Sequence, residues 1–145
     1  SNGYSSRLYQ RLVKELKVFS EINAFITGEI EMGLFIICGK VIDGIDIKGA
    51  EKLIFEEINN IKQNKITTEE LVKVKNKIES LITFENTSAL NKAMGLCMAE
   101  HLGNIEMVNE MINFYLSVNV DDIKRVANDI FKKSNCSVLY YLKSK

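Results

Sequence analysis

Apolar residues change their spacing twice within the first part of the chain. Leu8, Leu12 and Leu16 recur every four residues, which predicts a helix with one apolar face. From Phe19 onward apolar and polar residues alternate, which is typical of a half-buried strand. A continuous apolar run at 34–38 predicts a second strand that is covered on both faces. The two strands are expected to form an antiparallel hairpin.

The stretch from Asp46 to about Lys133 predicts five consecutive helices, because apolar residues recur there at helical spacing. Each helix is expected to begin at a residue whose side chain can accept hydrogen bonds from free backbone amides. These residues are Asp46, Thr67, Ser88, Asn104 and Asn119. Thr67 and Glu70 are spaced as a capping box, in which each side chain bonds the other's amide. The β-rich segment Ser137–Leu142 predicts a short third strand.

This order predicts an α+β fold, in which a small antiparallel sheet is covered by a block of helices. Residues 1–145 are expected to form a single domain, with Ser1 and Asn2 as the remnant of an expression tag. A three-stranded sheet is narrow for a domain of this size and exposes at least one edge. The chain is therefore expected to be a fragment or to pair with another chain. A homodimer through the open sheet edge is one such pairing.

Charge and composition narrow the classes of partner. Lys+Arg and Asp+Glu are equal at 19 each, whereas nucleic-acid binding needs a basic surplus, so we expect no nucleic-acid partner. No apolar run approaches the roughly 20 residues that span a bilayer, so we expect no membrane partner. The three cysteines lack paired spacing and are expected to be reduced and buried. Reduced cysteines slightly favour the cytoplasm, and the periplasm stays open if a signal peptide has been removed.

Candidate chemistry is sparse. His101 is the only histidine, which excludes both H-E-x-x-H and H-x-x-E-H, because each of these zinc motifs needs two. Cys97 and His101 share one helix face, with Glu100 adjacent, so they could begin a metal site. We favour a structural interpretation, because Cys97 lies among apolar residues and His101 can interact with a helix C-terminal dipole. We therefore expect no metal ion or other cofactor in this chain.

Five segments carry motifs that follow one another in a distinctive order. They are Ser5–Gln10 (S-S-R-L-Y-Q), Gly33–Ile36, Ala50–Glu57, Ile66–Leu71 and Val118–Ile123. In this order they resemble the C-terminal half-domain of the pitrilysin/insulinase family of zinc peptidases. The similarity extends over essentially the whole chain and implies the fold of that half-domain.

The resemblance implies that two homologous halves with different roles face each other across a closed chamber. One half of such a peptidase carries the inverted zinc motif, and the other supplies chamber wall. An Arg and a Tyr of this second half help to hold substrate. The tyrosine position matches Phe19, and the arginine position falls at Val13, with Arg11 close by. Phe19 and Arg11 are therefore the candidate substrate-binding residues, and no catalytic residue is expected.

The function that follows from the resemblance is that of a non-catalytic domain, which forms the wall of a peptide-binding chamber and supports a zinc-bearing half. The implied partners are that catalytic half, in the same longer chain or in a separate subunit, and unstructured peptides. Zinc is expected on the partner half alone. One alternative is an assembly module that keeps the peptidase fold without binding peptides. Another is an independent cysteine hydrolase, although no local signature marks Cys38, Cys97 or Cys136 as a nucleophile.

Overall fold

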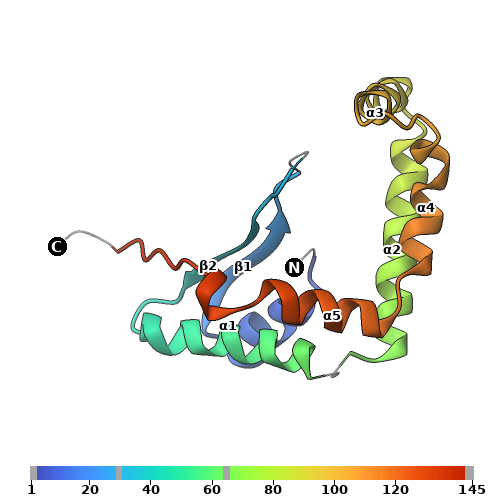
Figure 1. Cartoon of the computed structure of the whole chain (residues 1–145). Helices are drawn as coiled ribbons and strands as arrows, with labels where there is room; N and C mark the ends of the chain where they lie inside the picture. Colours follow the sequence, from blue (N-terminus) through green and yellow to red (C-terminus); the bar gives the residue numbers. More distant parts are fainter. Residues whose placement is uncertain (1–2, 29–30, 64–65, 143–145) are drawn as a thin grey trace.

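The computed structural model describes residues 3–28, 31–63 and 66–142 (Figure 1). Ser1 and Asn2, the expected tag remnant, lie outside the described residues. The elements, in chain order, are the helix η1 (Tyr9–Glu15), the strands β1 (Phe19–Ile26) and β2 (Phe35–Val41), the helices α1 (Ile47–Lys62), α2 (Thr68–Glu85), α3 (Ala89–His101), α4 (Met107–Ser117) and α5 (Val120–Ile130), and the short helix η2 (Lys133–Asn135). The predicted α+β fold class is confirmed. None of the helices in the described ranges is both long and apolar enough to cross a membrane.

The predicted antiparallel hairpin is also confirmed, and β1 pairs with β2 starting from Phe19 opposite Val41. The predicted third strand is wrong: residues 137–142 do not join the sheet, which among the described residues contains β1 and β2 alone. A β-rich segment needs an adjacent strand edge to form a ladder, and this segment leads away from the hairpin (Figure 1). It is held instead by the Tyr140 hydroxyl, which donates a hydrogen bond to the Glu51 carboxylate on α1.

The core lies where η1, the hairpin and α1 meet. Its buried residues are Leu12 from η1, Phe19 and Ile22 from β1, and Ala50 from α1. Gly39 lies on β2, where a Cβ atom would come within 2.7 Å of the Phe19 ring. The absence of a side chain at Gly39 therefore leaves the space that the Phe19 ring occupies. This cluster attaches the first helix to the sheet and leaves the polar face of η1 outward.

Two expectations of burial are wrong. The cysteines are free, but all three are exposed. The strand β2 was expected to be covered on both faces, yet its pattern is mostly exposed. The reason is that the core takes Ile37 and Val41 from β2, which lie on one face of the strand. Cys38 points to the opposite face, which has no covering layer among the described residues.

The helices α2, α3 and α4 form an arm that extends away from the sheet (Figure 1). In this arm α2 and α4 lie side by side, and α3 crosses its far end in contact with α4. The Lys75 ammonium of α2 donates to the Leu116 carbonyl near the end of α4, at 2.6 Å. The chain then returns through α5, which packs against α1. There the Lys62 ammonium donates to the Phe131 carbonyl at 3.0 Å. A lysine thus bonds one carbonyl at the C-terminal end of α4 and another at that of α5.

Candidate functional site

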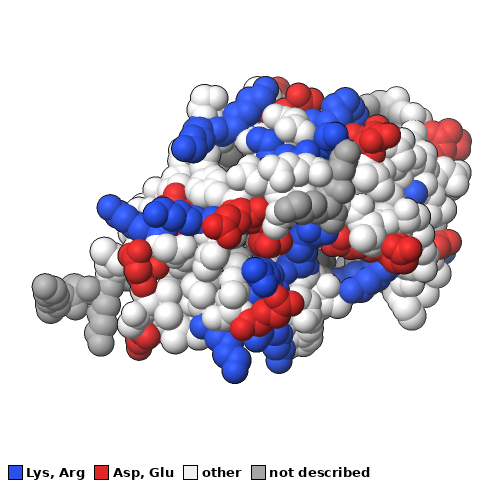
Figure 2. All heavy atoms as spheres, turned by 90° about the horizontal axis from the view of Figure 1, so that it is seen from below, with Lys and Arg blue, Asp and Glu red and all other residues white. Residues whose placement is uncertain are grey.

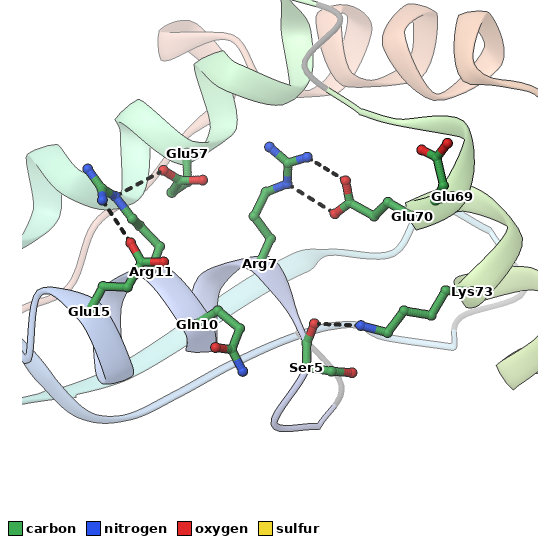
Figure 3. Close-up of a pocket in the computed structure, with 9 residues that line it drawn as sticks. All are labelled: Ser5, Arg7, Gln10, Arg11, Glu15, Glu57, Glu69, Glu70 and Lys73. Carbon is green, nitrogen blue, oxygen red and sulfur yellow. Dashed lines mark hydrogen bonds and ion pairs between the residues drawn. The ribbon is translucent and has the colours of Figure 1, made fainter.

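A shallow charged hollow lies where η1, the second half of α1 and the start of α2 come together (Figure 3). Its volume is about 460 Å³. The lining residues are Ser5, Arg7, Gln10, Arg11, Glu15, Glu57, Glu69, Glu70 and Lys73. Because the hollow contains Arg11, one of the two predicted substrate-binding residues, it is the candidate functional site.

Arg7 and Glu70 connect the segment before η1 to the start of α2. The Arg7 Nε donates to Glu70 Oε1 at 3.2 Å and Nη2 donates to Oε2 at 2.5 Å, which is the two-bond geometry of a guanidinium on a carboxylate. The hydrogen bond to Glu70 raises the pKa of Arg7. The predicted capping box is therefore half formed. Thr67 accepts from the Glu70 amide at 3.2 Å, but Arg7 engages the Glu70 carboxylate, because two charge-assisted bonds outweigh one bond to an amide.

Arg11 lies beside two other carboxylates of the hollow. Its Nη1 donates to Glu15 Oε2 at 2.8 Å, and its Nε lies 4.0 Å from Glu57 Oε1. The hydrogen bond to Glu15 is the main reason that the pKa of Arg11 is raised. Glu57, on α1, is only 8% exposed and also accepts from the Asn60 side-chain amide at 3.1 Å. A buried carboxylate needs partners of this kind, so Arg11 helps to stabilise the fold as well as facing the hollow.

The remaining cation, Lys73, also has a partner, because its ammonium donates to the Ser5 carbonyl at 3.2 Å. The pKa of Glu69 is lowered, chiefly because its carboxylate accepts from its own backbone amide and also from Thr67. Figure 2 shows charges of both signs interspersed over one face of the molecule. The hollow is thus an ionic network of three cations and four carboxylates, which can brace η1 against the arm and present polar groups to an extended chain.

Phe19, the other predicted substrate-binding residue, does not line the hollow. It is 3% exposed and lies in the core. Val13, at the arginine position of the family pattern, is half-buried against the same core. The structure therefore separates the predicted pair: Arg11 reaches the hollow, and Phe19 lies beneath the surface. Their roles toward a substrate stay predictions.

Sequence reasoning missed that Arg7, Glu57, Glu70 and Lys73 belong to one cluster. Arg7 and Glu70 are separated by 63 positions, and no spacing rule connects residues so far apart. Arg7 lies within the S-S-R-L-Y-Q motif, which drew attention to the segment but did not indicate a partner for the arginine.

The alternative metal site, formed by Cys97 and His101, lies on α3 at the far end of the arm. Both side chains are exposed, as is that of Glu100. In the part of the chain that the structure describes, no group of three or more His, Cys, Asp or Glu side chains is arranged to hold a metal ion. The hollow beside η1 therefore stays the candidate site.

Three solved structures are similar to this chain. A protease from Helicobacter pylori matches with a TM-score of 0.84 at 22% identity, over 92% of this chain and 32% of that one. The inactive peptidase domain of a candidate zinc protease from Bordetella parapertussis matches with a TM-score of 0.81 at 20% identity, over 93% of this chain and 73% of that one. A candidate zinc protease from Bordetella pertussis Tohama I matches with a TM-score of 0.83 at 20% identity, over 98% of this chain and 78% of that one. This chain thus spans about a third of the length of the Helicobacter protein, and the likeness shows the fold.

A search of curated proteins finds no match to this chain. The model of the Peptidase M16 inactive domain matches residues 1–78. This range includes η1, the hairpin, α1 and the part of α2 that lines the hollow. The match confirms the resemblance to the non-catalytic C-terminal half of pitrilysin-type peptidases. Because the matched range is more than half of the sequence, this chain belongs to the family of the peptidase M16 inactive domain.

Proposed function

We propose that this chain is a non-catalytic domain of a zinc metallopeptidase, which forms part of the wall of a peptide-binding chamber and supports a zinc-bearing partner half. The partner half lies in the same longer chain or in a separate subunit. Membership of the inactive domain family supports a role without catalysis. The single histidine supports it independently, because the inverted zinc motif needs two.

The observation that carries this proposal is the amount of uncovered surface. The accessible surface is 11155 Å², whereas a compact monomer of 16.5 kDa exposes about 7,500 Å². Only six apolar residues of the described part are buried, although 46% of the chain is hydrophobic. The excess on this one chain, on the order of 3,600 Å², is larger than the roughly 1,000–2,500 Å² that each partner buries in a permanent interface between subunits. A chain of this kind is expected to work with a partner that covers it.

The hairpin offers one surface for the partner half. Within the described residues each strand pairs only with the other, so both outer edges have backbone groups that can pair with an added strand. Phe25 and Ile26, at the end of β1, are exposed, and this end of the hairpin projects from the molecule (Figure 1). An added strand would extend the sheet and place its own side chains beside Phe25 and Ile26.

Affinity purification of the tagged chain from its native organism tests the proposal, when the eluate is assayed for cleavage of unstructured peptides. We expect cleavage that a chelator abolishes and that co-purifies with a zinc-bearing half. A pure single chain that neither cleaves nor binds peptides contradicts the proposal. Adding back zinc after chelation should restore the cleavage, which separates loss of the metal from loss of the assembly.

A second candidate function is an assembly module that keeps the fold without binding peptides. The burial of Phe19 and the engagement of Arg11 by Glu15 and Glu57 favour it, because neither predicted residue is free to hold substrate. Peptide affinity of the zinc-free assembly distinguishes the two functions. If the chain forms a chamber wall, the Arg11→Ala variant should bind peptides more weakly than the wild type. The control variant Arg125→Ala, at an exposed position, should bind them equally well. If the assembly does not bind peptides, the assembly module is favoured. Peptide binding that is equal in both variants excludes Arg11 as a substrate-holding residue.

A further inference from the structure

The segment that leads from η1 into β1 has three irregular backbone features. η1 is wound as a π-helix, and the Leu16 amide that follows it bonds to the Arg11 carbonyl, five positions earlier, at 3.0 Å. Lys17 has a φ of 52° and is, among the described residues, the one non-glycine residue with a positive φ. β1 then begins with a shift of register that is typical of a β-bulge. Such irregularities concentrate near functional sites, and η1 supplies side chains to the hollow (Figure 3).

The π winding changes which side chains of η1 are neighbours. In an α-helix, residues four positions apart share a face, so Leu16 would lie next to Leu12 on the face that enters the core. In a π-helix each turn takes about one more residue, so residues five positions apart become neighbours. The Lys14 ammonium accordingly lies 5.9 Å from the centre of the Tyr9 ring. Leu12 is 0% exposed and Leu16 is 37% exposed, so the apolar face that the sequence spacing predicts is interrupted at Leu16.

The left-handed backbone of Lys17 ends η1 in this winding. It turns the chain so that the Val18 amide bonds to the Leu12 carbonyl, six positions earlier, at 3.0 Å. Left-handed residues satisfy the last carbonyls of α-helices in a similar way, and glycine is the usual residue there. A lysine has a Cβ atom, which makes this conformation unfavourable. A residue of this kind keeps such a conformation only where the surrounding structure imposes it.

We propose that Lys17 is a positioning residue, which locks η1 in its π winding and thereby fixes how Glu15 and Arg11 face the hollow. Leu12 is anchored in the core, so a change to α winding would rotate the following residues about it. Leu16 would move onto the core face, and Glu15 would turn in the same direction, toward the core and away from the hollow. The lock concerns the conformation of the chain itself, so it holds whether or not the hollow binds peptides.

A series of substitutions at Lys17 tests the lock, because residues differ in how readily they adopt a left-handed conformation. Glycine adopts it without a steric cost, asparagine is enriched there, and a β-branched valine is the least tolerant. Nuclear magnetic resonance can measure the scalar coupling across the hydrogen bond from the Leu16 amide to its acceptor carbonyl. We expect coupling to the Arg11 carbonyl in the wild type, Lys17→Gly and Lys17→Asn. In Lys17→Val this coupling should be lost, and coupling to the Leu12 carbonyl should appear.

Urea unfolding of the same variants gives a second measurement, which does not require Lys17→Val to stay fully folded. The urea midpoint should fall for Lys17→Val and should not fall for Lys17→Gly or Lys17→Asn. The matched control is Lys40→Val on β2, an exposed position where valine suits the strand, and its midpoint should not fall. The proposal is overturned if the wild-type Leu16 amide couples to the Leu12 carbonyl, or if a folded Lys17→Val keeps its coupling to Arg11. It is equally overturned if Lys17→Gly lowers the midpoint as much as Lys17→Val does.

Discussion

The contact between Arg7 and Glu70 predicts a measurable coupling between the first helix and the arm. Two charge-assisted hydrogen bonds join the side chains, at 3.2 and 2.5 Å. The exposed fractions of the side chains are 23% for Arg7 and 35% for Glu70, so water screens the pair in part. Fully exposed pairs contribute about 0.2–1 kcal/mol, and hydrogen bonds to charged groups about 1.5–3 kcal/mol. We therefore expect a coupling free energy of about 1–2 kcal/mol.

A double-mutant cycle measures this coupling directly. The variants are Arg7→Met, which keeps most of the apolar stem, Glu70→Gln, and the two together. The free energy of unfolding of each is obtained from urea titration. Arg7→Lys is expected to recover only part of the coupling, because an ammonium cannot form the planar two-bond contact. Added salt should reduce the coupling, since both groups are partly exposed.

The pair Asp122 and Arg125 serves as the control for this cycle. The Arg125 Nη2 lies 3.7 Å from the Asp122 Oδ1, and the side chains are 66% exposed for Arg125 and 38% for Asp122. We therefore expect a coupling free energy of about a few tenths of a kcal/mol. The reasoning is refuted if the coupling of Arg7 with Glu70 is no larger than that of the control pair. In that case the first helix is attached to the rest of the chain mainly by its apolar core and by the contacts of Arg11 with Glu57 and of Lys73 with Ser5.

Three further predictions concern the core, a helix cap and a titrating group. Gly39→Ala should lower the free energy of unfolding, measured by urea titration, by about 1–3 kcal/mol, because the added Cβ atom would lie 2.7 Å from the Phe19 ring. A Cβ atom at Gly28 would meet no atom within 4 Å, so an equal loss for Gly28→Ala would contradict this prediction. Asn119→Ala should cost about 1 kcal/mol, because it removes half of the α5 capping box; an unchanged Tm would count against it. The pKa of Tyr140 is raised by its hydrogen bond to a carboxylate of α1. The neutral phenol is thus favoured in the folded chain, so its contribution to stability is present below about pH 10 and lost as pH rises through the folded pKa. An absorbance titration of tyrosine ionisation compares the wild type with Tyr140→Phe. If the ionisation that the variant loses has an ordinary tyrosine pKa, the contact is excluded.

The sequence alone was sufficient for most of the local structure. The hairpin, the five helices and the start of α5 at Asn119 were all predicted, because periodicity and capping depend on residues within a few positions of each other. The same local motifs carried the resemblance to the peptidase family, which the family match confirmed. Arg11 was placed near the candidate site by that resemblance, and not by any spacing within the chain.

The tertiary structure alone decided which distant residues meet and which surfaces are left uncovered. Glu70 was predicted to cap its own helix, but it binds Arg7, which lies 63 positions away. Residues 137–142 have the composition of a strand, yet they pair with no strand among the described residues. In both cases the local preference is worth about 1 kcal/mol, and the outcome depends on which group the chain path brings within hydrogen-bonding distance. That path is a property of the whole fold, and no local pattern encodes it.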